Sequence, residues 1–161
     1  MSVPKKTTFT GSCHCGYIKY TVALPINTTT TTSSSSSSET NFVVSRCNCT
    51  ICLKQGYTSL RFAHEDFTLL SPESEAQLND YKAGSMDVHK YFCGKCGIHV
   101  FSRGRFELDG HTHEFSSLNV LTLDQPQDGL DLSKAKVQYF DGRNDNWNAG
   151  PRVSPWPGQC V

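Results

Sequence analysis

The chain has 161 residues, with 15 basic and 15 acidic side chains and a formal net charge of zero. This length fits one domain, expected to span residues 1–161, and a domain of this size can bury a hydrophobic core. The lack of a basic excess argues against nucleic acid as the main partner. No apolar run in the sequence approaches the roughly 20 residues that cross a bilayer, so we expect no membrane partner.

The N-terminal residues and the cysteine content together predict a reducing environment. Lys5 and Lys6 are not followed by an apolar stretch, so no secretory signal is predicted and a cytoplasmic location is expected. Thiols stay reduced in such a compartment. Clustered cysteines there bind metal more often than they form disulfides.

The first predicted strand lies within residues 12–24. Apolar side chains recur there at every second position, the period of a strand with one buried face: Ile18, Tyr20, Val22 and Leu24. Pro25 ends this strand. A run of threonines and serines then fills most of 27–40, and it cannot bury enough apolar surface to offset its ordering entropy. We therefore predict a flexible loop over residues 27–40.

The rest of the chain is predicted to be mainly β, without an internal repeat. Further short strands are expected at residues 42–44, 57–63, 67–70, 88–92, 98–101, 115–123 and 137–140. The segments 88–92 and 98–101 flank a pair of cysteines like the arms of a hairpin. One helical turn is expected after Cys49, and residues 73–78 could form a short helix or an irregular connection. The tail from Asp141 onward reads as irregular structure.

Seven of the eight cysteines fall into three tight groups. The groups are Cys13 with Cys15, then Cys47 with Cys49 and Cys52, and finally Cys93 with Cys96. The third group has the form of a zinc knuckle, because two cysteines separated by two residues can reach one ion and flanking glycines relieve the tight turn. Cys160 stands alone near the C-terminus and is predicted to be an unligated thiol.

The third group supplies half of a tetrahedral site and needs a second pair. That pair could be the first group or two members of the second. If the three thiols of the second group face one metal, a four-plus-three division accounts for all seven. A four-sulfur site is closed and structural, whereas a three-sulfur site leaves a position open for water or substrate. Disulfides, a redox Cys-x-x-Cys, two purely structural sites and an iron–sulfur cluster remain as alternatives.

Other polar residues near the cysteines are not assigned as ligands or catalytic groups. His14 is expected to face solvent, and three more histidines are expected on the surface or in loops: His99, His111 and His113. Arg46 and Lys54 could position a carboxylate or an oxyanion, but each could equally be a solvated surface charge. Tyr57 is expected to pack within its strand.

The order and spacing of the three cysteine groups resemble those of the glutathione-dependent formaldehyde-activating enzyme family, whose domain centromere protein V shares. The resemblance extends from about Thr8 to about Phe140. It rests on the motifs Gly11-Ser12-Cys13-His14-Cys15-Gly16, Cys47-x-Cys49-x-x-Cys52 and Tyr91-Phe92-Cys93-x-x-Cys96-Gly97. The sequence departs from the family pattern at two positions. Many members carry a histidine where this chain has Asn48 and an arginine where it has Leu53. These changes leave the cysteines intact and bear on the substrate.

The resemblance implies a β-tent fold, with two or three small antiparallel sheets and zinc knuckles. It also implies two zinc ions in each chain. The ligands implied for the structural ion are Cys13, Cys15, Cys93 and Cys96. The ligands implied for the catalytic ion are Cys47, Cys49 and Cys52.

The activity implied by the resemblance is that of a zinc-dependent carbon–sulfur lyase acting on the adduct of an aldehyde with glutathione or another thiol. Zinc with three thiolates carries a net charge of −1, so it should activate water less well than zinc held by neutral histidines, and binding of a substrate thiol is favoured. Two alternatives remain: a tailoring enzyme of secondary metabolism with a non-glutathione substrate, and a non-catalytic interaction module stabilised by zinc. The expected partner is a small molecule, and a homodimer is left open.

Overall fold

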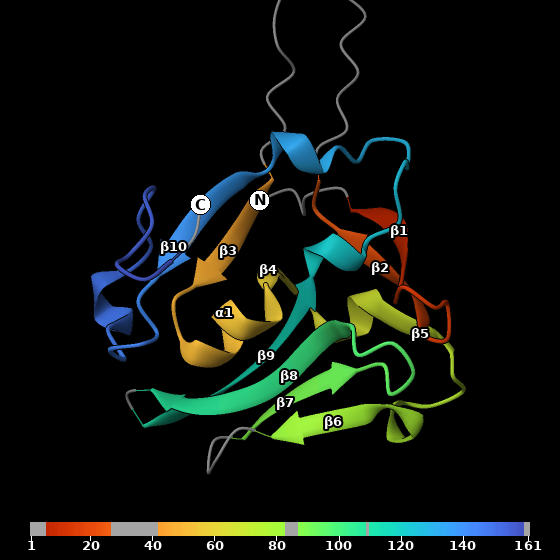
Figure 1. The fold of residues 1–161 in the computed structure, drawn as a ribbon, viewed down its shortest axis with the longest axis horizontal. Coiled ribbons are helices and arrows are strands. Elements are labelled where there is room, and N and C mark those ends of the chain that lie inside the picture. The colour runs from red at the N-terminus through yellow and green to blue at the C-terminus, as the bar shows by residue number, and fades with distance from the viewer. Residues whose placement is uncertain (1–5, 27–41, 83–86, 109, 160–161) are drawn as a thin grey trace, which may run out of the picture.

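Ten strands in two sheets and one α-helix form the part of the chain that the computed structural model describes, residues 6–26, 42–82, 87–108 and 110–159. The mainly β arrangement predicted from the sequence is confirmed. In Figure 1 the smaller sheet lies at the right, and the larger sheet runs from the upper left through the centre to the bottom of the molecule. The Thr/Ser-rich loop predicted at 27–40 and Cys160 lie outside the described residues.

The smaller sheet is antiparallel and has the order β1-β2-β5. Its strands are β1 (Thr7–Ser12), β2 (Lys19–Leu24) and β5 (Phe67–Ser71). The alternation that predicted β2 is confirmed, because Tyr20, Val22 and Leu24 are fully buried. No strand was predicted at β1, because Phe9 is its one large apolar residue. The strand forms through its backbone pairing with β2.

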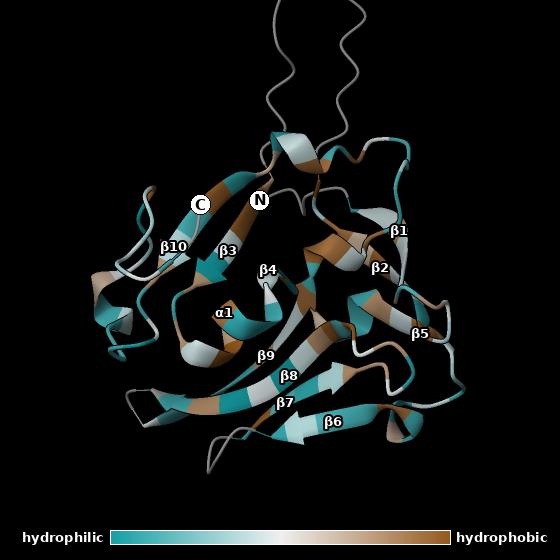
Figure 2. Ribbon diagram, in the orientation of Figure 1, coloured by the Kyte–Doolittle hydropathy of each residue, from teal (hydrophilic) through white to brown (hydrophobic). Residues whose placement is uncertain are grey.

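The larger sheet has seven strands in the order β10-β3-β4-β9-β8-β7-β6. Their bounds are β3 (Val43–Cys47), β4 (Thr58–Phe62), β6 (Asn79–Lys82), β7 (Val88–Phe92), β8 (His99–Leu108), β9 (His111–Asn119) and β10 (Lys136–Phe140). The pair β3 and β10 is parallel, a feature the sequence did not predict. The edge strand β6 was also not predicted; all four of its side chains are exposed, and Figure 2 shows it almost wholly hydrophilic.

Helical structure is limited to short segments. The helix α1 (Thr50–Gln55) follows Cys49, where a helical turn was predicted. Five 3-10 turns complete the described chain: η1 (His64–Asp66), η2 (Glu75–Gln77), η3 (Val120–Thr122), η4 (Leu132–Lys134) and η5 (Trp147–Ala149). Residues 73–78, predicted as a short helix or an irregular connection, contain the 3-10 turn η2. The strand predicted at 115–123 ends before residue 120, where η3 begins. No helix in the described ranges is long and apolar enough to cross a membrane.

Stacked aromatic rings join the two sheets. Phe67 of β5 lies 5.2 Å from Tyr20 of β2 and 4.8 Å from Phe101 of β8, measured between ring centroids. Phe101 in turn stacks on Tyr91 of β7 at 4.7 Å. Buried aromatic pairs of this kind add roughly 0.5–1.5 kcal/mol each beyond their area burial. The core therefore fixes β2, β5, β7 and β8 relative to one another, and with them the cysteine-bearing loops at their ends.

Candidate metal centres

Two hairpin loops, one from each sheet, carry the first and third cysteine groups. The loop between β1 and β2 holds Cys13 and Cys15, and the loop between β7 and β8 holds Cys93 and Cys96. The loops share a hydrogen-bond pattern: the N–H of Cys13 donates to the carbonyl of Ile18 at 3.0 Å, and that of Cys93 to Ile98 at 2.9 Å. Each turn then passes through a glycine with a φ of 73°, a conformation that other residues rarely adopt.

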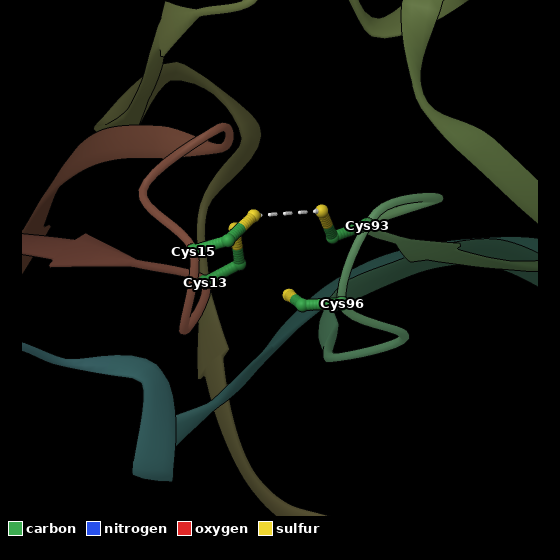
Figure 3. A group of neighbouring side chains, drawn as sticks. All are labelled: Cys13, Cys15, Cys93 and Cys96. Atoms are coloured by element: carbon green, nitrogen blue, oxygen red, sulfur yellow. Dashed lines mark hydrogen bonds between the residues drawn. The ribbon is translucent and has the colours of Figure 1, made fainter.

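The sulfur atoms of these two loops converge on one point, as Figure 3 shows. All four Sγ atoms lie within 4.8 Å of one another, and the Sγ of Cys15 lies 3.6 Å from those of Cys13 and Cys93. A disulfide would need about 2.05 Å, and these cysteines are free. Ligands about 2.3 Å from a tetrahedral zinc lie about 3.8 Å apart, so the sulfur positions fit this ion. We refer to this group as the four-thiol group.

The four-thiol group joins the two sheets. Cys13 and Cys93 are buried, with 2% and 0% of their surface exposed, while Cys15 reaches the surface. The sequence left open which pair would complete the third group. The structure brings the first group to it and keeps the second group apart.

The second cysteine group forms a separate cluster, which we call the three-thiol group. Cys47 ends β3, Cys49 precedes the first turn of α1, and Cys52 lies within α1. Their Sγ atoms lie within 4.8 Å of one another, and no fourth His, Cys, Asp or Glu of the described chain joins them. The strand therefore turns directly into a helix, and this turn aims three sulfurs at one point. Three thiols without a fourth side-chain ligand are the donor set of an open metal site.

Hydrogen bonding among these thiols separates their pKa values. Contacts with Cys47 and then Cys52 hold the pKa of the Cys49 thiol well below its ordinary value. The contact with Cys47, followed by that with Cys49, raises the pKa of Cys52. Without a cation the three sulfurs thus share protons around one thiolate, because three adjacent negative charges would repel one another. A bound divalent cation removes that conflict, and the group fits one.

The segment after β10 packs against the three-thiol group and is held there by Asn48. This side chain is 1% exposed, and its Nδ2 donates to Asp141 Oδ1 at 2.6 Å. Its Oδ1 accepts the backbone N–H of Arg143 at 2.8 Å. Between these two residues Gly142 lies so close to Cys47 that a Cβ would overlap the Sγ. Asn48 therefore influences the site by holding residues 141–143 in place, because almost none of its own surface is accessible.

A buried polar cluster lies next to α1 and was missed by the sequence analysis. Its members come from β7, β8, β9 and the residue before β4, and each is at most 7% exposed: Tyr57, Lys90, His99, Ser102 and Ser117. The hydroxyl of Tyr57 donates to the carbonyl of Ser117 at 2.9 Å, and the Tyr57 ring stacks on His99 at 4.5 Å. The expectation that Tyr57 packs rather than acts as an acid agrees with this placement, and burial raises the pKa of its hydroxyl.

The expectation that His99 lies on the surface or in a loop is wrong. His99 begins β8 and is 5% exposed, because pairing with Phe92 carries it inside the sheet. Its Nε2 lies 3.0 Å from the carbonyl of Phe101 and 3.0 Å from Ser102 Oγ, so this nitrogen carries the proton. Nδ1 has no hydrogen-bond partner among the described residues. Desolvation, followed by the charge of Lys90, lowers the pKa of His99 to about 4.

Ring titration by nuclear magnetic resonance should separate His99 from His89. A hydrogen bond from the His89 ring to the Asp80 carboxylate raises the pKa of His89, so this ring should titrate above the ordinary histidine range. His99 should stay neutral until the pH falls to about 4. As the pH falls, His99 binds a proton in the unfolded chain at about pH 6.5 but in the folded chain only at about pH 4. The protein therefore loses stability between these two pH values. A His99 signal that titrates near pH 6.5 would contradict its burial.

The remaining polar residues singled out from the sequence include three exposed histidines, none of which joins a cysteine group, and two basic residues. His14, His111 and His113 are exposed, as expected. Arg46 donates from Nε to Thr58 Oγ1 at 3.3 Å across the β3–β4 pair, and Lys54 is exposed on α1. Neither cation forms an ion pair with a carboxylate of the described residues.

A mainly β domain with one four-thiol and one three-thiol group defines a class of candidate metalloproteins. Similarity to known proteins then assigns the chain to a family within this class. The chain belongs to the glutathione-dependent formaldehyde-activating enzyme family, whose match covers residues 8–140. A Rhodobacter sphaeroides protein of known crystal structure has a similar fold, with a TM-score of 0.50 and 20% sequence identity. That match covers 73% of this chain and 90% of the other chain. The family links the chain to glutathione-dependent formaldehyde activation.

Proposed function

We propose that this protein is a zinc-dependent carbon–sulfur lyase that acts on the adduct of an aldehyde with glutathione or a related thiol. The observation that carries the proposal is the three-thiol group, which gathers three sulfurs without a fourth side-chain ligand from the described chain. Family membership supports the substrate class, since the family is named for glutathione and formaldehyde. A reducing location such as the cytoplasm would keep the cysteines available as thiols.

The two cysteine groups would hold one zinc ion each, with different roles. Cys13, Cys15, Cys93 and Cys96 would hold the structural ion, because four sulfurs complete a tetrahedral shell. Cys47, Cys49 and Cys52 would hold the second ion and leave one position for the substrate. Bound there, zinc would supply a Lewis acid that binds the sulfur of a thiol substrate in its deprotonated form.

The reaction needs no oxidant or reductant. In the direction of adduct formation, the thiol sulfur forms a bond to the aldehyde carbon, and the proton lost by the thiol ends on the former carbonyl oxygen. The reverse reaction breaks the carbon–sulfur bond and returns the proton. Holding both reactants together would lower the entropic part of the barrier.

The residues of the chain contribute by holding and shielding the site. Asn48 and Gly142 keep the segment after β10 against Cys47. The Tyr57 hydroxyl donates a hydrogen bond to the carbonyl of Ser117, and burial raises the pKa of this hydroxyl. The hydroxyl therefore stays protonated near neutral pH. Tyr57 is therefore a packing residue beside α1 rather than the general base of the site.

Exchange spectroscopy by nuclear magnetic resonance tests the proposed function. In a mixture of glutathione and formaldehyde, the zinc-loaded wild type should speed exchange between the free thiol and its adduct above the uncatalysed rate. Cys49→Ser should return exchange to the uncatalysed rate, whereas Cys160→Ser, which alters a thiol of neither group, should leave it high. Circular dichroism would verify that both variants are folded. A zinc-loaded wild type that gives no acceleration would leave a tailoring reaction on another substrate, or a non-catalytic interaction module.

A further inference from the structure

Lys90 is a buried cation, and the described part of the chain provides no carboxylate to balance it. It lies in β7 and is 6% exposed. Its Nζ lies 3.5 Å from Ser102 Oγ and 5.2 Å from the centre of the Tyr57 ring. No carboxylate within residues 6–26, 42–82, 87–108 and 110–159 forms an ion pair with it. An isolated buried ammonium is costly, so a compensating negative charge is expected nearby.

The neighbouring strands do not provide this charge. Lys90 faces Ser102 across the β7–β8 pair, Ser102 faces Ser117 across the β8–β9 pair, and Ser117 faces Arg61 across the β4–β9 pair, so this row carries no negative charge. Burial keeps His99, which also contacts Ser102, neutral near pH 7. Burial raises the pKa of the Tyr57 hydroxyl, which donates to the carbonyl of Ser117, so this group is neutral as well.

The three-thiol group lies on the remaining side. The backbone N–H of Tyr57 donates to the carbonyl of Cys52 at 2.9 Å, and the ring of the same tyrosine lies beneath the Lys90 ammonium. Tyr57 therefore contacts both the Lys90 ammonium, through its ring, and the backbone of Cys52, through its N–H. This region is buried, and charges there are less screened than at the surface.

We propose that Lys90 is the counter-charge of the three-thiol site, and that it favours an anionic sulfur as the fourth metal ligand. Three thiolates and a divalent cation carry a net charge of −1, which one ammonium neutralises. A fourth thiolate brings the site to −2, and Lys90 reduces this to −1. A neutral fourth ligand leaves the charge unchanged and gains nothing further from Lys90. The part concerning the fourth ligand rests on the proposed function, whereas the part concerning the metal does not.

Lys90 is thus a positioning residue, and metal binding is its first test. Lys90→Met keeps an unbranched side chain, one atom shorter, and removes the charge. The zinc dissociation constant of the three-thiol group, measured by chelator competition, should rise at least about tenfold, while that of the four-thiol group should not change. The matched control is Lys82→Met on the adjacent strand β6, where the lysine is 46% exposed and pairs with Asp87. This control should bind zinc as the wild type does.

The second test uses simple probes for the fourth ligand. With cobalt(II) in place of zinc, 2-mercaptoethanol and imidazole are titrated separately, and their binding is followed by the visible spectrum of the ion. Lys90→Met should weaken binding of the thiol at least about fivefold relative to imidazole. An equal loss for both probes, or no loss for either, would overturn the preference for an anionic ligand.

A pair of further variants protects the test from a folding defect. If Lys90→Met does not fold, Lys90→Arg, which retains the charge, is compared with Lys90→Gln, which removes it. The proposal requires Lys90→Arg to bind zinc at the three-thiol group more tightly than Lys90→Gln does. Equal affinities in these two variants, or wild-type affinity in Lys90→Met, would contradict it. Neither readout depends on turnover, so failure of the glutathione exchange assay would leave this result standing.

Discussion

Cys93→Ser should lower the free energy of unfolding of the zinc-loaded protein by at least about 3 kcal/mol. Cys93 is fully buried, and its Sγ lies in the four-thiol group that joins the hairpin of one sheet to the hairpin of the other. A serine oxygen is a poor substitute for a thiolate ligand of zinc, so the metal-mediated link should be largely lost. Chemical denaturation with saturating zinc measures the effect.

The control for this variant is Cys160→Ser, which makes the same chemical change at the cysteine that the sequence predicts to be unligated. It should unfold at the same denaturant concentration as the wild type. A strong chelator should remove most of the difference between wild type and Cys93→Ser, because the wild type then loses its ion as well. If Cys93→Ser and wild type unfold together in saturating zinc, the four-thiol group does not stabilise the fold through a metal.

Gly142→Ala should weaken zinc binding by the three-thiol group at least about tenfold while leaving the four-thiol group intact. A methyl group at this position would overlap the Cys47 Sγ and lie 2.9 Å from the Trp147 ring. Cys47 and Trp147 cannot both keep their positions beside this methyl group. Hydrogen bonds between Asn48 and residues 141 and 143 limit how far the backbone can shift away from them. Either Cys47 rotates away from its partners or the segment lifts from the site. Chelator competition resolves the two affinities.

The matched control for Gly142→Ala is Gly94→Ala, in the hairpin loop of the four-thiol group. The added methyl there meets the amide end of the Asn79 side chain on the exposed strand β6, which can move aside. This variant should retain both metal affinities within about threefold. Equal zinc binding by Gly142→Ala and wild type would show that the segment after β10 does not constrain Cys47.

The elements with a strong local pattern could be predicted from the sequence. The alternation at β2 and the apolar segments on both sides of Cys93 and Cys96 each report burial directly, and the structure confirms a strand and a hairpin there. The edge strands β1 and β6 carry too few apolar residues for such a signal. They are ordered by hydrogen bonds to β2 and β7, which are contacts between distant segments that a local pattern does not contain.

The cysteine positions could likewise be predicted, but their surroundings could not. Spacing alone left two partners for Cys93 and Cys96, and the packing of two sheets selected between them. The burial of His99 and Lys90 could not be predicted from the sequence. Both are polar residues, and whether they are buried depends on what packs over their face of the larger sheet. The sequence marked Asn48 only as a departure from the family pattern, and its burial and its hydrogen bonds with the segment after β10 could not be predicted from it.

The most direct test of the central claim is the zinc content per chain of wild type and Cys47→Ser, measured after removal of loosely bound metal. Two sites, one closed and one open, predict about two zinc ions in the wild type and about one in the variant, with the fold retained. The retained ion should be the one bound by Cys13, Cys15, Cys93 and Cys96, whose sulfurs lie within 4.8 Å of one another. One zinc in the wild type, or an unfolded and metal-free Cys47→Ser, would contradict the division into a structural and an open site.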